Sequence, residues 1–261
     1  MSTTAEPPID PNRPSSARIY DAFLGGTHNF ASDRAIVART LELMPDMPAI
    51  TRSNRAFLHR AVRYATAQGI RQFLDLGSGI PTEQNVHQTA PDARVVYVDV
   101  DPTAVLYGRH LVGDDPRAAV IHGDLRQPSI LLDEPEVKDL LDLSQPIGIL
   151  MVAVLHFIPD SPALSEALPV YREIAAPGSM LVLSHATIDE RAPELERVAD
   201  LYNRTGSSLL PRGCEQVERF FDGWVLEEPG VVPAPRWRPD PGEEAPDPST
   251  FLMLAGVARK D

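Results

Sequence analysis

Two aspartates and a pair of glycines, each at the end of an apolar stretch, are the residues best suited to bind a ligand. The segment FLDLGSG carries Asp75 and then Gly77, Ser78 and Gly79, where an apolar stretch gives way to the polar sequence IPTEQN. Glycines at a strand-to-helix turn let the backbone bend tightly and approach a ligand closely. Asp99 ends the next apolar stretch, about 20 residues after Gly79, where a carboxylate can accept hydrogen bonds from ribose hydroxyls. The glycine turn alone fits any tight turn, but with Asp99 it predicts a site for a nucleoside-containing cofactor.

The turn after Gly79 is unfavourable for a diphosphate. A dinucleotide site needs a third glycine and a helix N-terminus directed at the pyrophosphate. Here Thr82 stands at the third glycine position, Pro81 has no backbone N–H, and Glu83 places negative charge where a phosphate would lie. S-adenosylmethionine has no phosphate, and its sulfonium and ammonium favour nearby carboxylates such as Asp75, directly or through water. The turn therefore favours S-adenosylmethionine over NAD or NADP.

Further polar residues could contribute to such a site. Asp124 follows a short apolar stretch and would lie at the carboxyl edge of a sheet, where it could accept from an adenine amine or serve as a turn or cap residue. His156 follows the fourth expected strand and is a candidate general base, with a structural role in the core as the alternative. Tyr20, close to the sequence GGTHNF, is a second catalytic candidate. The histidines show no metal-ligand spacing, so we expect no metal.

The periodicity of the chain predicts how these residues are positioned. Short apolar stretches separated by helical segments indicate βαβ units and a mainly parallel, doubly wound Rossmann-like sheet. The expected strands are 72–76, 95–100, 118–121, 147–154 and 180–183, with an antiparallel pair at 224–226 and 250–258. The expected helices are 32–43, 51–68, 161–175, 188–204 and 215–221, with a short helical stretch before Gly25 and another helix beginning near residue 82 or 83.

Three segments follow from this pattern. Residues 1–14 are polar and proline-rich and are expected to form a disordered tail. Residues 15–69 are expected to form a helical lid with a glycine pair at residues 25 and 26, although a static brace is the alternative. Residues 70–261 are expected to form the cofactor-binding domain.

Composition limits the classes of partner. The chain has 261 residues, is 43% hydrophobic and carries a formal net charge of -13, which argues against nucleic acid or an anionic membrane as partner. The only cysteine is Cys214, so no intrachain disulfide can form. No apolar stretch approaches the roughly 20 residues that span a bilayer, and the N-terminal sequence does not read as a signal peptide. We therefore expect a cytoplasmic protein.

The ordered motifs FLDLGSG, VVYVDVDP, VIHGDLRQP and ILMVAVLHFIPD resemble those of class I S-adenosylmethionine-dependent methyltransferases. The sequence ARIYDAFLGGTHNFASDR, together with LGSGIPT, resembles more narrowly a bacterial family known simply as S-adenosyl methyltransferases. The resemblance implies that Asp75, Gly77 and Gly79 contact the methionine part of the cofactor, that Asp99 contacts the ribose, and that Asp124 with Leu125 contacts adenine. Ser78 and Val100, next to these residues, are also expected to bind the cofactor. The resemblance also implies that the N-terminal segment covers the cofactor cleft, and we expect Tyr20, Gly26 and Asn29 of this segment to bind the cofactor.

The function that these features predict is methyl transfer from S-adenosylmethionine, with S-adenosylhomocysteine as product, to an unidentified acceptor. We expect a small-molecule acceptor, because the N-terminal segment and the loop at residues 203–214 could close over a pocket. Two alternatives stay open: a non-catalytic S-adenosylmethionine-binding regulator and, less favoured, an NAD(P)-dependent oxidoreductase. The sequence predicts no particular oligomeric state.

Overall fold

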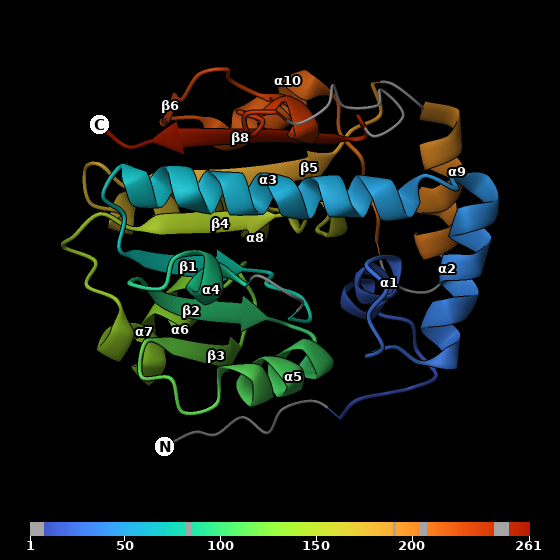
Figure 1. Cartoon of the computed structure of the whole chain (residues 1–261), viewed down its shortest axis with the longest axis horizontal. Coiled ribbons are helices and arrows are strands. Elements are labelled where there is room, and N and C mark those ends of the chain that lie inside the picture. Colours follow the sequence, from blue (N-terminus) through green and yellow to red (C-terminus); the bar gives the residue numbers. More distant parts are fainter. Residues whose placement is uncertain (1–7, 82–84, 190–191, 204–207, 243–250) are drawn as a thin grey trace.

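The computed structural model describes residues 8–81, 85–189, 192–203, 208–242 and 251–261, which form a mainly parallel sheet between two layers of helices (Figure 1). The strands are β1 (Gln72–Leu76), β2 (Arg94–Asp99), β3 (Ala118–His122), β4 (Gly148–Val152), β5 (Met180–Ala186), β6 (Val225–Leu226), β7 (Val232–Pro233) and β8 (Met253–Arg259). Their order is β3-β2-β1-β4-β5-β8-β6, and β7 also pairs with β8. Strands β1 to β5 are parallel, whereas β8 runs antiparallel to β5, β6 and β7. This confirms the predicted doubly wound sheet with an antiparallel C-terminal end.

The helices differ from the prediction mainly at their ends. They are α1 (Ser16–Phe23), α2 (Ala31–Leu43), α3 (Met47–Ala67), α4 (Val86–Thr89), α5 (Pro102–Val112), α6 (Pro128–Asp133), α7 (Pro135–Leu140), α8 (Pro162–Ile174), α9 (Ala192–Asn203) and α10 (Cys214–Glu218), with 3-10 turns η1 (Leu155–Phe157), η2 (Arg219–Phe221) and η3 (Ala234–Arg236). Helix α3 begins at Met47 rather than near residue 51, because Pro48 falls in the first turn, where its missing N–H leaves no hydrogen bond unmade. The helix start expected at residue 82 or 83 lies outside the described residues.

The sheet is buried on both faces, as a parallel sheet with helices on each side must be. Successive residues of β1 point to opposite faces, so that Phe73 joins one core with Phe57 of α3, and Leu74 joins the other with Tyr171 of α8. All five residues of β1 are buried. Such continuous burial explains why β1 reads in the sequence as an apolar stretch interrupted only by Gln72 and Asp75.

The carboxyl ends of β1 and β4 form the point where the sheet changes winding direction. The two strands are neighbours, yet the chain leaves β1 toward α4 on the α3 side and leaves β4 toward α8 on the other side (Figure 1). Ligands of open α/β sheets bind in the crevice at such a point. Strand β4 ends at Val152, earlier than expected, because Ala153 adopts a left-handed backbone with φ of 55° and turns the chain out of the sheet.

The N-terminal helices stand at this same edge of the sheet. Figure 1 shows α1, α2 and α9 beside the ends of the parallel strands. A buried ion pair joins α1 to α2, with Arg18 Nε 2.8 Å from Asp33 Oδ2. Asp33 also accepts from the backbone of Ser15 and Phe30, and Arg18 also donates to Thr103 at the start of α5. These bonds satisfy charges that would otherwise be costly to bury. The division of the chain at residues 14 and 69 stays a prediction.

Candidate active site

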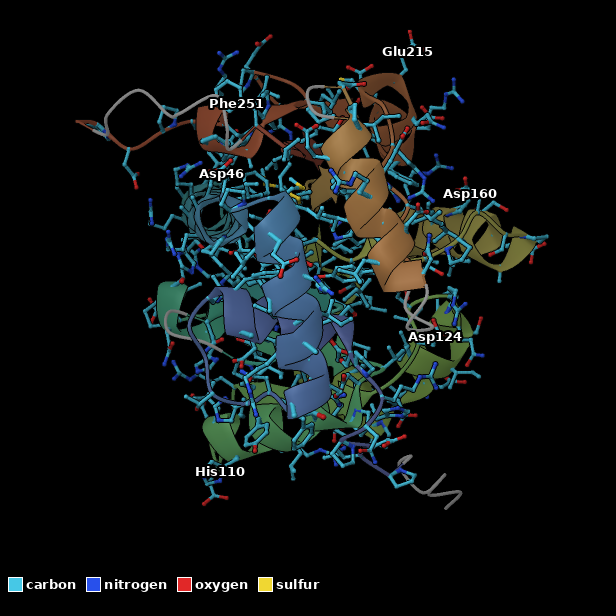
Figure 2. The ribbon with its side chains drawn as sticks, turned by 90° about the vertical axis from the view of Figure 1, so that its right-hand side faces the viewer. Asp46, His110, Asp124, Asp160, Glu215 and Phe251 are labelled. Carbon is cyan, nitrogen blue, oxygen red and sulfur yellow. The ribbon has the colours of Figure 1, made fainter. Side chains whose placement is uncertain are left out.

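A cavity of about 460 Å³ opens at the carboxyl ends of β1, β2 and β4, a volume typical of small-molecule sites. Figure 2 looks onto this edge of the molecule, with α2 and α9 in front and Asp124 to one side. Most of the residues predicted to bind the cofactor line the cavity, namely Tyr20, Asp75, Gly77, Ser78, Gly79, Asp99, Val100, Asp124 and Leu125. The fold thus brings together in one cavity residues that are spread over positions 20 to 125 of the chain.

The turn after β1 requires its glycines. Gly77 and Gly79 have φ values of 76° and 67°, in the left-handed region that favours glycine. A Cβ atom on Gly77 would also lie 2.3 Å from the side chain of Val154. The amides of Gly77 and Ser78 both donate to the carbonyl of Val98, at 2.8 and 3.1 Å, which fixes the turn against β2.

Asp99 ends β2 directly beside this turn. Its Oδ2 accepts from the amide of Gly79 at 2.7 Å and its Oδ1 from the amide of Asp101 at 2.8 Å. Burial raises the pKa of Asp99 to about 6, although the backbone amides act in the opposite direction. Each carboxylate oxygen can accept more than one hydrogen bond, so Asp99 can still bind hydroxyl groups of a ligand.

Asp75 lies deeper, in β1, and is only 6% exposed. Burial raises its pKa to about 7, the positive charge of Arg55 lowers it, and repulsion from Asp99 adds to the rise. A cationic ligand group beside Asp75 would restore the ionised form, because an opposite charge favours it. Asp75 therefore has the position and the chemistry to bind an ammonium.

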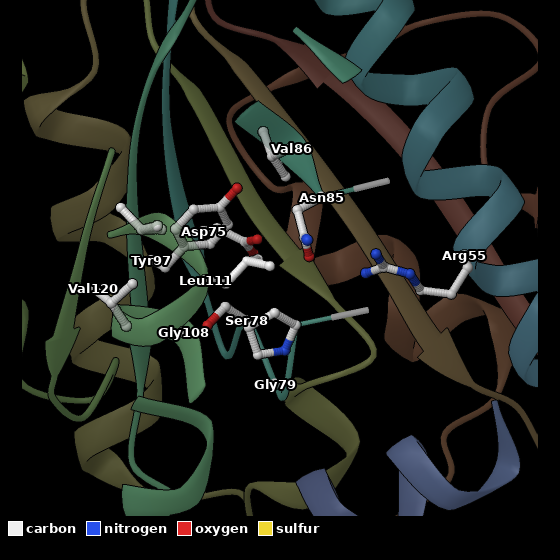
Figure 3. Close-up of a pocket in the computed structure, with 12 residues that line it drawn as sticks. Arg55, Asp75, Ser78, Gly79, Asn85, Val86, Tyr97, Gly108, Leu111 and Val120 are labelled. Atoms are coloured by element: carbon white, nitrogen blue, oxygen red, sulfur yellow. The ribbon is translucent and has the colours of Figure 1, made fainter. Parts of the chain in front are cut away.

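Arg55 is a site residue that the sequence analysis missed. It projects from α3 into the cavity and also lines a small recess of about 20 Å³ with Asp75, Ser78 and Asn85. Figure 3 shows its guanidinium reaching from the helix toward Asn85 and Asp75. Its Nη2 atom is buried and has no hydrogen-bond partner, which is unusual for a buried polar group. No sequence motif marks this arginine, because a charged residue on an amphipathic helix reads as solvent-exposed.

The loop after β3 forms the opposite wall. Asp124 is held by Arg126, whose Nη2 lies 2.5 Å from Asp124 Oδ2. Burial opposes ionisation of Asp124, but the hydrogen bonds from Arg126 outweigh it and lower the pKa of the carboxyl. The carbonyl of Leu125 accepts from the hydroxyl of Tyr171 at 2.7 Å, which fixes the loop on α8. Val100, 57% exposed, lies on the cavity wall as an apolar surface that a planar ring could cover.

Tyr20 lines the cavity from α1, and its hydroxyl is fully engaged. It donates to the carbonyl of Thr51 at 3.2 Å and accepts from Asn54 Nδ2 at 2.9 Å. Asn54 Oδ1 in turn accepts from the hydroxyl of Ser184 at 2.6 Å. Burial raises the pKa of Tyr20, so the phenol is protonated at neutral pH and acts here as a hydrogen-bonded wall residue.

Gly26 and Asn29 do not line the cavity, although both were predicted to bind the cofactor. They lie against the buried carboxylate of Asp21: Asn29 Nδ2 donates to Asp21 Oδ2 at 3.1 Å, and a Cβ atom on Gly26 would meet Asp21 Oδ1 at 2.0 Å. The geometry accounts for both residues through the packing of the α1–α2 connection. Their contact with a cofactor stays a prediction.

His156 lies outside the 460 Å³ cavity and faces a second chamber next to it. Its Nδ1 accepts from the amide of Ala186 at 3.2 Å. Burial lowers its pKa well below the usual value, and the nearby His185 and Arg212 act in the same direction. The ring is therefore uncharged.

Two further classes of site were tested on the described residues. Within them, no group of three or more His, Cys, Asp or Glu side chains is arranged to hold a metal ion. No helix in the same residues combines the length and the apolar character needed to cross a membrane.

The strand order and the glycine turn define a Rossmann-like fold, and Asp75 and Asp99 lie in the cavity at the carboxyl edge of its sheet. The chain belongs to the S-adenosyl methyltransferase family, whose model matches residues 2–261. It is similar to the crystal structure of a presumed methyltransferase from Thermobifida fusca YX, with 39% identity, a TM-score of 0.90 and 99% of each chain covered. It is also similar to a DUF574 family protein from Streptomyces avermitilis MA-4680, with 35% identity, a TM-score of 0.92, and 97% of this chain and 100% of that chain covered.

A more distant structure shares the fold. The N-methyltransferase NodS from Bradyrhizobium japonicum WM9, in complex with S-adenosylhomocysteine, is 15% identical, with a TM-score of 0.52 and 93% of this chain and 98% of that chain covered. A search of curated proteins finds no match. The chain is therefore an S-adenosylmethionine-dependent methyltransferase.

Proposed function

We propose that this methyltransferase acts on a small-molecule acceptor and binds S-adenosylmethionine through three groups of residues. Asp99 accepts from the ribose hydroxyls, and Asp75 and Arg55 receive the ammonium and carboxylate of the methionine part. Asp124, Leu125 and Val100 form the adenine wall. The observation that carries this proposal is the unpartnered Nη2 atom of Arg55, buried in the same cavity as Asp75 and Asp99.

The residues present fit S-adenosylmethionine in charge as well as in position. The amino-acid end of the methionine part carries an ammonium and a carboxylate, and the cavity places the buried carboxylate of Asp75 and a buried guanidinium nitrogen of Arg55 without a hydrogen-bond partner among its lining groups. The turn around Gly79 offers little to a phosphate, because the Gly79 amide already donates to Asp99 and Pro81 has no N–H. This match supports S-adenosylmethionine over a dinucleotide.

The N-terminal helix supports a small acceptor. Ser16 and Tyr20 of α1, with Leu24 directly after it, line one side of the cavity and narrow the space beside the proposed reacting end. Such a wall excludes water and restricts access to molecules that fit inside.

The chain's contribution to the reaction is alignment and exclusion of water. When bound, S-adenosylmethionine supplies a methyl group that passes to a lone pair of the acceptor while the carbon–sulfur electron pair stays on sulfur. A proton carried by the attacking atom of the acceptor is lost to bulk solvent outside the closed site. Asp99 and the glycine turn hold the nucleoside end, Asp75 and Arg55 hold the amino-acid end, and Tyr20 and Ala153 shape the space between. Holding the partners at attack distance removes much of the entropic part of the barrier.

Two measurements test the proposal. Isothermal titration calorimetry should detect binding of S-adenosylhomocysteine to the purified chain. Release of S-adenosylhomocysteine should then be screened against low-molecular-weight and macromolecular fractions from the source organism. Activity confined to the macromolecular fraction would contradict a small acceptor, and cofactor binding without turnover in any fraction would favour a regulator.

A further inference from the structure

A second chamber of about 60 Å³ adjoins the cofactor cavity on the side of α1, α3 and α9. The two spaces share Tyr20, Asn54, Ala153 and Phe157 as common walls. Ala153 adopts its left-handed backbone at this boundary, where its amide donates to the hydroxyl of Ser184 at 3.0 Å. Strained backbone of this kind persists where the surrounding structure holds it, often at functional sites. The chamber is therefore next to the reacting end of the proposed cofactor site.

The walls of the chamber are apolar and rich in aromatic rings. Phe23, Ile50, Leu195 and Val198 supply apolar surface, while Tyr202 stacks on Phe157 with ring centroids 6.1 Å apart and an interplanar angle of 23°. Among the described residues that line the chamber there is no Asp, Glu, Lys or Arg. A charged group placed there would lose its hydration without gaining a partner of opposite charge, which is strongly unfavourable.

His156 supplies a polar group with a defined role. Because Nδ1 accepts the amide hydrogen of Ala186, the proton of the uncharged ring is carried by Nε2. The residues that surround the ring keep this state: His185 lies in edge contact at 5.3 Å between ring centroids, and Arg212 donates to His185 at 2.7 Å. His156 thus offers a hydrogen-bond donor, and in this arrangement it is not a base.

We propose that the chamber binds the methyl acceptor, and that the acceptor is an uncharged aromatic small molecule with an oxygen or ring nitrogen that accepts from His156 Nε2. This inference rests on the proposed function, because the acceptor must face the methyl group across the boundary formed by Tyr20, Ala153 and Phe157. The aromatic walls favour a planar ring. His156 is then a positioning residue for the acceptor.

Fluorine NMR with simple probes tests the class of ligand on the full chain saturated with S-adenosylhomocysteine. We expect 4-fluorophenol to bind at least tenfold more tightly than 4-fluorobenzoate or 4-fluorobenzylamine, which are charged at pH 7. Methyl resonances of Ile50, Leu195 and Val198 should shift on addition of 4-fluorophenol, and those of Val225 on β6 should not. Equal or tighter binding of either charged probe, or binding without these shifts, would overturn the inference.

A chamber-filling variant gives a second test. Val198→Trp should weaken 4-fluorophenol binding at least tenfold and leave the affinity for S-adenosylhomocysteine within twofold, whereas Val225→Trp, at an exposed position, should change neither. If Val198→Trp does not fold, the methyl shifts of the wild-type chain still show whether 4-fluorophenol binds in the chamber. The proton on His156 Nε2 can be observed directly in spectra of ¹⁵N-histidine-labelled protein, and a proton on Nδ1 would overturn its assigned role. Failure of S-adenosylhomocysteine to bind would instead contradict the proposed function itself.

Discussion

Asp99 Oδ2 lies 2.7 Å from the backbone nitrogen of Gly79, so the acid at the end of β2 closes the glycine turn that follows β1. The same carboxylate accepts from the backbone amide of Asp101, the residue whose side chain caps the N-terminus of α5. One side chain therefore connects the two loops between which a nucleoside would lie, and its removal should affect both the ligand and the turn.

Asp99→Asn should weaken binding of S-adenosylhomocysteine by about 10- to 150-fold, the range expected for loss of a hydrogen bond to a charged group of roughly 1.5–3 kcal/mol. Calorimetry measures the effect, with circular dichroism to confirm folding. Asp139→Asn, at an exposed position on α7, is the matched control. Unchanged affinity in a folded Asp99→Asn protein would remove Asp99 from the site.

Arg55→Gln should discriminate between ligands with and without a carboxylate. The variant loses the guanidinium proposed to receive the methionine carboxylate, so its affinity for S-adenosylhomocysteine should fall about 10-fold or more. Its affinity for 5′-methylthioadenosine, which has no carboxylate, should change less than about twofold. Arg52→Gln, one turn earlier on α3 and exposed, should bind both ligands as the wild type does. Equal losses for both ligands would indicate a general structural role for Arg55.

Asp75→Asn should stabilise the ligand-free protein at high pH. Burial raises the pKa of Asp75 from 3.8 to about 7 in the folded chain, so between these values the folded state binds more protons than the unfolded state. The free energy of unfolding therefore falls as the pH rises from about 4 to 7. Replacing the carboxyl by an amide removes this pH-dependent loss of stability. At pH 8 the variant should therefore melt at a higher temperature than the wild type, by about 2–4 °C for each kcal/mol gained in the free energy of unfolding.

At pH 5 the same variant should differ little from the wild type, because Asp75 is then largely protonated. Calorimetric melting across pH 5–8 measures the trend, and Asp139→Asn again provides the control. A variant less stable than the wild type by the same amount at both ends of this range would contradict the raised pKa. The affinity of Asp75→Asn for S-adenosylmethionine should fall, since its ammonium loses an opposite charge.

S-adenosylmethionine and S-adenosylhomocysteine should raise the melting temperature, whereas NAD and NADP should not. At a ligand concentration 100 times the Kd, the expected stabilisation of about 2.7 kcal/mol corresponds to a shift of roughly 5–10 °C. A pyrophosphate in this cavity would meet Asp75 and Asp99 and find few free amides in the turn. A larger shift with either dinucleotide would overturn the cofactor assignment.

Spacing along the chain was sufficient to predict that Asp75, the glycine turn and Asp99 lie together at one cavity. Asp75, the glycine turn and Asp99 lie at the ends of adjacent parallel strands, so local periodicity also fixes their position in space. Asp124 follows the same rule at the end of β3. The parallel sheet and its antiparallel end were predictable for the same reason, because strand-length apolar stretches separated by helical segments allow few topologies.

The positions of several other residues could not be predicted in this way. Arg55 and Asn54 reach the cavity because α3 crosses the edge of the sheet at a particular angle, which depends on packing and not on spacing. His156 follows β4 as expected, but the left-handed turn at Ala153 directs it away from the cofactor cavity and into the second chamber. Gly26 and Asn29 stand out in the sequence, yet the buried carboxylate of Asp21 accounts for both.

The N-terminal helices provide the last prediction: residues 15–45 act as a lid whose ordering depends on the cofactor. Ser15 hydrogen-bonds to Asp101, and the Asp101 amide donates to Asp99, so the segment is connected to the proposed ribose-binding acid through a single residue. Gly25, with φ of 83°, provides the break between α1 and α2. Hydrogen exchange of residues 15–45 should slow by about tenfold or more on addition of S-adenosylhomocysteine, equivalent to roughly 1.4 kcal/mol of added protection. Exchange in β8 should change little.

Deletion of residues 1–30 should abolish methyl transfer and weaken cofactor binding while the sheet stays folded. The deletion removes Arg18 and would leave Asp33 as an unpaired buried charge, so it should be combined with Asp33→Asn to separate loss of the lid from loss of an ion pair. The full-length Asp33→Asn chain is the matched control. If the segment is equally protected with and without ligand, and the truncated chain binds S-adenosylhomocysteine normally, α1 and α2 form a static brace. The buried Arg18–Asp33 pair would then serve only to hold that brace against α5.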